Sequence, residues 1–130
     1  MAFAYVANFA SSTISVIDTN VHSVIATVIL NSSPAFISFS PDSQLAYVLS
    51  TPISFTNKTV SVIDVKTHAT ISTLQVGFAP NSLAISPDGK SVYITNLGED
   101  KVSVIDTKTQ AVIATITVGN NPVFVAISST

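Results

Sequence analysis

The sequence contains no cysteine and no arginine, and only 9% of its 130 residues are charged. Without cysteine, disulfide bonds and thiolate metal sites are excluded. Arginine is the side chain best suited to hold phosphate groups through a planar fork, and the net charge here is −2. Because affinity for a phosphate backbone comes from positive charge, the composition disfavours nucleic-acid binding.

Long apolar runs are also missing, although 47% of the residues are hydrophobic. A membrane-spanning helix needs roughly 20 consecutive apolar residues, and no run approaches that length. We therefore expect no membrane insertion. The first residues, MAFAYVANF, show neither a basic segment nor a long apolar segment, so no signal peptide is visible. The chain is too apolar for disorder, and its hydrophobic side chains are expected to be buried between protein surfaces.

The chain repeats itself. The tetrapeptide SVID occurs at 15–18, 61–64 and 103–106. Tyr5, Tyr47 and Tyr93 are separated by 42 and then 46 residues, and the extra four residues lie in the segment STPISFTNKT, residues 50–59. A fixed period of this size is typical of repeat architectures. We interpret the chain as one domain of three repeats, 1–45, 46–91 and 92–130.

Each repeat predicts four short strands. Runs rich in Val, Ile, Thr, Tyr and Phe alternate with turn sequences. The segments Ser-Pro-Asp-Ser at 40–43 and Ser-Pro-Asp-Gly at 86–89 predict tight hairpins. Strands such as SVIATVIL at 23–30 are apolar on both faces, so their sheets must be covered on both sides. These features predict an all-β fold, a β-propeller with three four-stranded antiparallel blades per chain.

The segments AYVAN, AYVLS and VYITN, each followed by an SVID strand, resemble the YVTN family of β-propeller repeats. The resemblance implies that 36–40, 82–86 and 123–128 form the innermost strands. It implies that Tyr-Val-x-Asn is the second strand, SVID the third, and the VIAT-type segment the outermost. Members include surface-layer and exported proteins, so it also implies an extracellular or cell-surface location. Propellers of this family usually have seven blades, whereas this chain has three.

Three blades do not close a ring, because propellers typically have four to eight. The sequence begins at a second strand and ends at an innermost strand, and the spacing across its two ends matches an internal hairpin. We therefore expect a two-fold homodimer with six blades, in which the last strand of each chain pairs with the first strand of the other. A fragment of a longer protein and a nine-bladed trimer are the alternatives. The predicted closure residues are Ala4, Tyr5, Val6, Val123, Phe124, Val125, Ala126 and Ile127.

Repeated carboxylates and imidazoles are the residues that invite a chemical interpretation. The first set is Asp18, Asp64 and Asp106 after the third strand, and the second is Asp42 and Asp88 in the Ser-Pro-Asp turns. Asp commonly accepts backbone N–H groups in turns, so we expect a structural role for both sets. His22 and His68 occupy equivalent turns of different blades, and we expect no metal site from them.

No catalytic constellation is visible. There is no Gly-x-Ser-x-Gly elbow and no glycine-rich phosphate loop among four glycines. We expect a non-enzymatic scaffold without a cofactor, which binds a protein or glycan partner through the loops of one face. A lactonase- or lyase-type enzyme with a central metal is the alternative that the resemblance implies, and nucleic-acid binding is disfavoured by charge. The candidate contact residues are Asn8, Phe9, Ser50, Ile53, Phe55, Asn81, Asn96, Leu97, Asn120 and Asn121.

Overall fold

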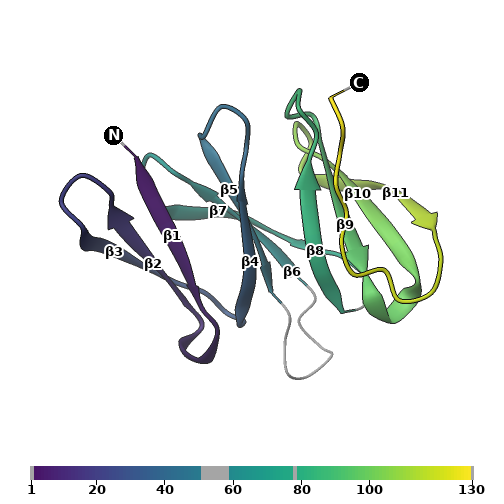
Figure 1. The fold of residues 1–130 in the computed structure, drawn as a ribbon, viewed down its shortest axis with the longest axis horizontal. Helices are drawn as coiled ribbons and strands as arrows, with labels where there is room; N and C mark the ends of the chain where they lie inside the picture. Colours follow the sequence, from purple (N-terminus) through teal and green to yellow (C-terminus); the bar gives the residue numbers. More distant parts are fainter. Residues whose placement is uncertain (1, 51–58, 78, 130) are drawn as a thin grey trace.

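The computed structural model describes residues 2–50, 59–77 and 79–129. Within these ranges eleven strands form three antiparallel sheets that stand side by side along the molecule (Figure 1). No helix among the described residues is long and apolar enough to cross a membrane. The all-β prediction and the blade-like, twisted antiparallel sheets are confirmed.

The strands follow one another along the chain, so each sheet is a meander. The first sheet comprises β1 (Phe3–Asn8), β2 (Thr13–Asp18) and β3 (Ser23–Ile29). The second comprises β4 (Pro34–Phe39), β5 (Leu45–Ser50), β6 (Thr59–Asp64) and β7 (Ala69–Gln75). The third comprises β8 (Pro80–Ile85), β9 (Ser91–Asn96), β10 (Lys101–Asp106) and β11 (Ala111–Thr117). Short 3-10 helices, η1 (Phe9–Ser11) and η2 (Leu97–Glu99), follow β1 and β9.

The three sheets share one register, which confirms that SVID is one strand of each blade. Tyr5 pairs with Val16 in the first sheet, and the equivalent tyrosines of the other sheets pair with the equivalent valines. The pairing of the third strand with the outermost strand shifts at the same point in every sheet. Such a bulge bends the strand and increases its twist. The sequence repeat is therefore also a geometric repeat.

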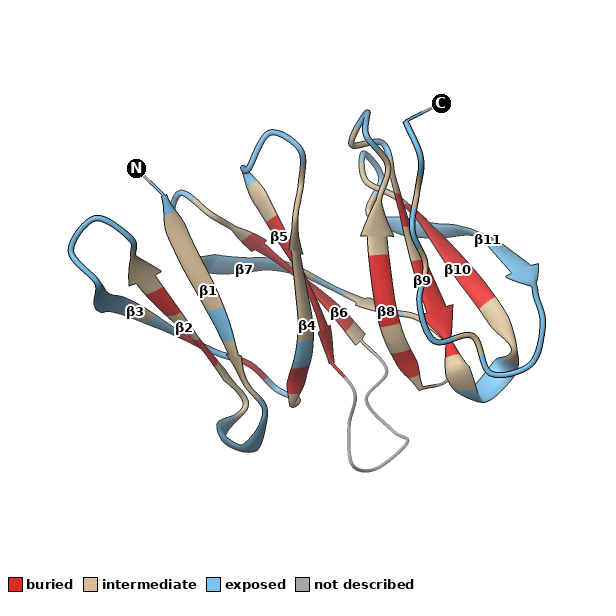
Figure 2. Ribbon diagram, viewed as in Figure 1, coloured by how far each residue is buried: buried red, intermediate tan, exposed pale blue. Residues whose placement is uncertain are grey.

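The hydrophobic core lies between the sheets, in two separate clusters (Figure 2). Ile14 and Val16 of the first sheet meet Val48 of the second sheet in one cluster. Tyr47 of the second sheet meets Ile94 of the third in the other cluster. The middle sheet is thus covered on both faces. The strand for which the sequence predicts covering on both sides, 23–30, is instead largely exposed, with Val24 58% and Ile29 81% exposed, because it lies at the outer edge of a sheet with a neighbour on one side only. Each fully buried side chain of this size contributes about 1.5–3 kcal/mol.

The segment 123–128, predicted as an innermost strand, forms no strand in the structure. It runs beside the third sheet, where the Asn81 side chain donates a hydrogen bond of 3.2 Å to the carbonyl oxygen of Val123. The first sheet correspondingly has three strands, and no described strand pairs with the outer side of β1. A chain with three blades brings its first and last strands to opposite ends, so the two segments do not meet within it (Figure 1).

Candidate functional site

The repeated aspartates are used by the turns in which they lie. Asp18 Oδ1 accepts a hydrogen bond of 2.8 Å from the backbone N–H of Asn20, and the same bond recurs at the equivalent aspartates. Asp42 and Asp88 each accept a bond of 2.6 Å from the serine hydroxyl two residues earlier. That bond, together with a backbone N–H bond, lowers the pKa of both carboxyl groups. The predicted structural role of these aspartates is confirmed.

The histidine turns are also structural. His22, His68 and Gln110 have the same left-handed backbone, with φ of 56°, 60° and 55°. The Nδ1 atom of His68 lies 2.6 Å from the hydroxyl of Tyr5, and the Phe3 ring packs edge-on against the imidazole at 4.9 Å. The described residues contain no group of three or more His, Asp or Glu side chains that could hold a metal ion.

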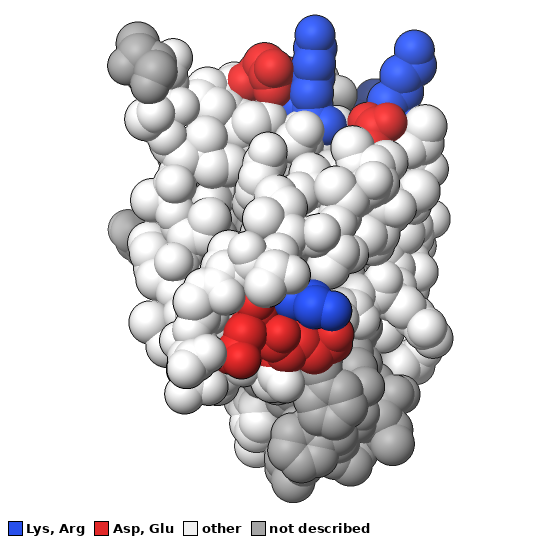
Figure 3. Space-filling view, turned by 90° about the vertical axis from the view of Figure 1, so that its right-hand side faces the viewer, with Lys and Arg blue, Asp and Glu red and all other residues white. Residues whose placement is uncertain are grey.

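The opposite end of the sheets carries loops of unequal charge: 9–12, 30–33 and 118–121 contain no charged residue, whereas 97–100 contains two. We call this surface the loop face and define it by residues 9–12, 30–33, 97–100 and 118–121. Its charged residues are Glu99 and Asp100, and Asp100 Oδ1 accepts a bond of 2.7 Å from the backbone N–H of Asn121. Figure 3 shows the charged side chains of one side of the molecule gathered towards its two ends, so the broad uncharged area lies along the side of the sheets and not at the loop face. Phe9, 41% exposed, lies on the loop face.

Two predicted contact residues do not reach the surface. Ser50 is fully buried and Asn96 is 1% exposed, so we correct both assignments. Asn96 Nδ2 donates a bond of 2.7 Å to the Ser103 hydroxyl on the paired strand. Asn8, its equivalent, donates in the same way to Ser15 at 2.8 Å. The asparagine of Tyr-Val-x-Asn therefore joins the second and third strands of its blade, because its side chain points across the pair.

The remaining candidates are distributed as follows. Phe9, Asn120 and Asn121 are exposed, while Leu97 and Asn81 are half-buried. Ile53 and Phe55, together with the rest of the insertion at 51–58, lie outside the described residues. The exposed candidates belong to the loop face, but they come from its two ends and do not form one cluster.

Sequence reasoning missed a pocket of about 240 Å³ between the first and second sheets. It is lined by Ile29, Leu30, Asn31, Ser32, Thr59, Ser61, Thr70 and Thr73. Five of these residues carry hydroxyl groups, one carries an amide and none is charged. The Ser32 and Thr59 hydroxyls lie 3.4 Å apart. Residues 30–32 belong to the loop face, so the pocket adjoins that surface. We call it the hydroxyl pocket.

The equivalent space between the second and third sheets is different in character. This pocket of about 200 Å³ is lined in part by Glu99, Asn96 and Gly77. A Cβ atom on Gly77 would lie 2.7 Å from the Asn96 side chain. Gly77 is the repeat equivalent of Asn31. The absence of a side chain at this position leaves room for the side chains of Asn96 and Glu99. The neutral hydroxyl lining is thus specific to the first interface.

The fold and the register define a β-propeller domain. The chain belongs to the Cytochrome D1 heme domain family, whose sequence model matches residues 2–123. No curated protein sequence matches it significantly. This family match supports the predicted propeller; it does not single out the YVTN repeats.

Solved structures agree on the propeller fold. The hydrazine synthase of Kuenenia stuttgartiensis is 25% identical, with a TM-score of 0.85 over 94% of this chain and 34% of that chain. The dihydro-heme d1 dehydrogenase NirN is 20% identical, with a TM-score of 0.77 over 88% of this chain and 24% of that chain. A Bacteroides fragilis protein provisionally named a 6-phosphogluconolactonase is 20% identical, with a TM-score of 0.79 over 94% of this chain and 37% of that chain. The chain spans about a third or less of the length of these structures.

The family name raises the question of whether the residues present fit a haem. Haem iron is usually held by His, Met, Cys or Tyr side chains. Strands β4 and β8 and the segment 123–128 contain none of these. His68 is bonded to Tyr5 at an inter-sheet contact, and the chain has no arginine to pair with haem carboxylates. The described residues do not fit the group, and we derive no haem chemistry from them.

Proposed function

We propose that this protein is a non-enzymatic β-propeller scaffold that binds a protein or glycan partner, and that a neutral glycan fits its surface best. The observation that carries the proposal is the hydroxyl pocket, with five hydroxyl groups, one amide and no charge, next to the loop segments 9–12 and 30–33, which contain no charged residue. A cell-surface location, as the YVTN resemblance implies, is part of this proposal.

The chemistry of the pocket supports a sugar ligand. Serine and threonine hydroxyls each donate one hydrogen bond and accept two, and the Asn31 amide does both. A sugar hydroxyl has the same mixed capacity, so such a lining can pair with it in several orientations. Ile29, 81% exposed, and Leu30 provide an apolar wall beside the polar groups. Binding sites commonly combine an apolar wall with a few convergent polar groups.

The test is a panel of neutral and acidic oligosaccharides, followed by calorimetry with the best ligand. Thr70→Val and Thr73→Val remove two pocket hydroxyls without changing the side-chain shape, and each should weaken binding at least fivefold. Thr27→Val is the matched control, because Thr27 takes the place of Thr73 in the first sheet and does not line the pocket. Absence of binding to any neutral oligosaccharide, or equal affinity in all three variants, would contradict the proposal.

A lactonase- or lyase-type enzyme with a central metal is the alternative. Its metal would need several carboxylate, amide or imidazole oxygen and nitrogen atoms near the propeller axis. Among the described innermost strands, β4 and β8, only Asn81 has such a side chain. Its Nδ2 binds the Val123 carbonyl and its Oδ1 accepts a bond of 2.7 Å from the Thr95 hydroxyl. Stoichiometric metal in protein purified without a chelator would favour the enzyme.

A further inference from the structure

Equivalent residues of successive sheets lie close to each other across the space between the sheets. At each end of the molecule one residue of such a pair has no neighbouring sheet to meet. The turn residue His68 of the second sheet reaches back to Tyr5 of the first sheet. Its equivalent in the third sheet, Gln110, lies near enough to Tyr47 of the second to lower the phenol pKa that burial raises, but its Nε2 donates to the Thr107 carbonyl at 2.8 Å and the Tyr47 hydroxyl has no hydrogen-bond partner among the described residues. The next members of the two series are His22 and Tyr93.

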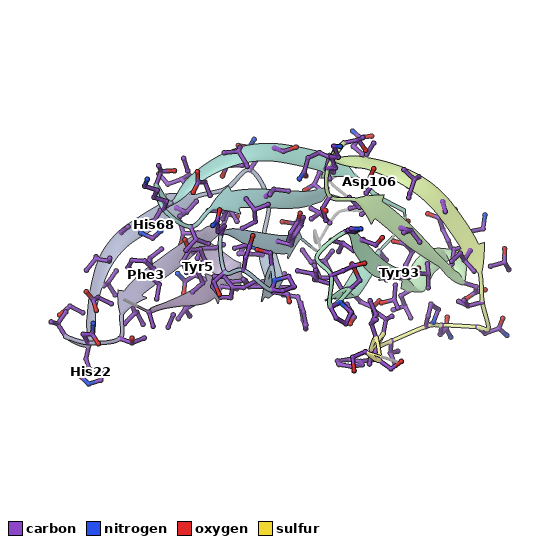
Figure 4. The ribbon with its side chains drawn as sticks, turned by 90° about the horizontal axis from the view of Figure 1, so that it is seen from above. Phe3, Tyr5, His22, His68, Tyr93 and Asp106 are labelled. Atoms are coloured by element: carbon purple, nitrogen blue, oxygen red, sulfur yellow. The ribbon has the colours of Figure 1, made fainter. Side chains whose placement is uncertain are left out.

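His22 and Tyr93 lie near opposite ends of the arc that the three sheets form (Figure 4). The backbone around both is already in the repeated geometry. His22 N donates a bond of 2.9 Å to the Asp18 carbonyl, just as His68 N donates one of 2.7 Å to the Asp64 carbonyl. Tyr93 occupies the same register position in β9 that Tyr5 occupies in β1. His22 and Tyr93 therefore have the backbone arrangement of the His68–Tyr5 pair, but the two residues lie near opposite ends of the chain's three sheets.

These residues lie on the sides of the first and third sheets that no other sheet covers, although Val102 and Val104, on the same face as Tyr93, are only 8% and 5% exposed. On the first sheet Val6 is 42% exposed, whereas its equivalents Val48 and Ile94 are fully buried. On the third sheet Ile116 is 44% exposed, whereas its equivalent Val28 is 6% exposed. These positions are apolar throughout the repeat and are covered wherever a neighbouring sheet is present.

Apolar side chains on the outermost strand of each sheet, which we call the rim, are exposed for a different reason. Ile71 of the middle sheet is 55% exposed although both faces of that sheet are covered, and its equivalents Ile25 and Ile113 are exposed to a similar extent. The rim is therefore exposed in every blade. Val6 and Ile116 differ because their exposure depends on whether a neighbouring sheet lies against them.

The segment 123–128 adds a second observation. Val123 is the repeat equivalent of Asn81, and the bond between the Asn81 side chain and the Val123 carbonyl holds the two equivalent positions side by side. The segment thus lies next to β8, where the innermost strand of a following blade would lie. The second strand of that blade would correspond to β1, whose outer side pairs with no described strand.

We propose that the open faces of two copies of this chain bind each other, the third sheet of each against the first sheet of the other, with His22 against Tyr93 of the second copy and segment 123–128 pairing with its β1. The second copy is the occupant that fits, because its faces repeat the register and the apolar positions of the two interfaces already formed. Two such contacts, related by a two-fold axis, give a closed assembly without a free apolar face.

Light scattering on the purified chain tests the assembly. We expect a monodisperse dimer, and we expect Val6→Lys to shift it to monomer over a concentration range in which the parent chain is dimeric. Ile71→Lys, a change of the same kind at the exposed rim, should leave the dimer intact. Far-UV circular dichroism of both variants establishes that the sheets are retained. A monomeric parent chain would overturn the proposal, as would a dimer that both substitutions affect equally.

Cross-linking tests the register without disturbing the fold. Because the chain has no cysteine, His22→Cys and Tyr93→Cys each introduce a single thiol. A short bis-maleimide should cross-link a mixture of the two variants into dimers but should not cross-link either variant alone. Ile71→Cys mixed with Tyr93→Cys is the control and should give no product. Failure of the 22–93 pair, or equal yield from the control pair, would show that the copies do not meet as proposed.

Discussion

The Tyr5 hydroxyl lies 2.6 Å from Nδ1 of His68, although 63 positions separate the two residues. The bond joins the first sheet to the second, and no backbone ladder connects these sheets. Phe39 of the second sheet packs edge-on against the Tyr5 ring with centroids 5.1 Å apart. Adjacent blades are therefore oriented by side chains, and Tyr5 contributes both an aromatic face and a hydrogen bond.

Removal of the Tyr5 hydroxyl should weaken the first interface. We expect Tyr5→Phe to lower the free energy of unfolding by about 1 kcal/mol, because a part-buried hydrogen bond is lost while the ring remains. His68→Gln should cost less than His68→Ala, since Gln110 occupies the equivalent position of the third sheet with the same left-handed backbone. Urea denaturation at a fixed protein concentration gives these values. If the effects of Tyr5→Phe and His68→Ala are simply additive in the double variant, the bond contributes nothing.

The same phenol predicts a loss of stability in alkali. Burial, reinforced by the negative charge of Asp64, raises the pKa of Tyr5 from 10.0 to about 12. The folded protein therefore holds this proton more tightly than the unfolded chain does. The resulting stabilisation is complete below pH 10.0 and is lost as the pH rises towards about 12. Thermal melts across this range should show the decline, and Tyr5→Phe should make it shallower; an identical decline in both proteins would contradict the assignment.

Gly77 and Gly119 should respond oppositely to alanine. A Cβ on Gly77 would lie 2.7 Å from Asn96 and 2.9 Å from Glu99, whereas a Cβ on Gly119 would meet nothing within 4 Å. We expect Gly77→Ala to destabilise the protein by about 1–3 kcal/mol through overpacking. Gly119→Ala should be neutral or should stabilise it by about 0.4–1 kcal/mol through the unfolded chain. Denaturation midpoints of the two variants check this, and equal midpoints would refute the steric argument.

The strands, turns and blade repeat follow from local sequence. Alternating β-branched residues, Ser-Pro-Asp turns and the spacing of Tyr5, Tyr47 and Tyr93 each act over a few positions or repeat at a fixed interval. The structure reproduces them, down to the common register of the sheets. The role of the aspartates was also predictable, because a carboxylate bonded to an N–H two residues ahead is a local interaction.

The candidate site was less predictable, because it depends on which side chains meet across blades. Sequence position placed Asn96 in a loop, but strand alternation turns its side chain towards Ser103, where it is buried. The hydroxyl pocket combines residues from β3, β6, β7 and the loop before β4. No spacing rule in the sequence indicates that these side chains share one space, and the contrast with the pocket beside Gly77 is visible only when both interfaces are formed.

The sequence by itself determined the blade, since period, apolar patterning and turn chemistry are properties of neighbouring residues. Only the tertiary structure decided that His68 is held by Tyr5, that Val48 is buried while its equivalent Val6 is 42% exposed, and that a neutral pocket opens between two sheets. The reason is physical. Equivalent positions of similar repeats have similar local energetics, and how far each is buried depends on what packs against it, which is set by the place of its blade in the assembled chain.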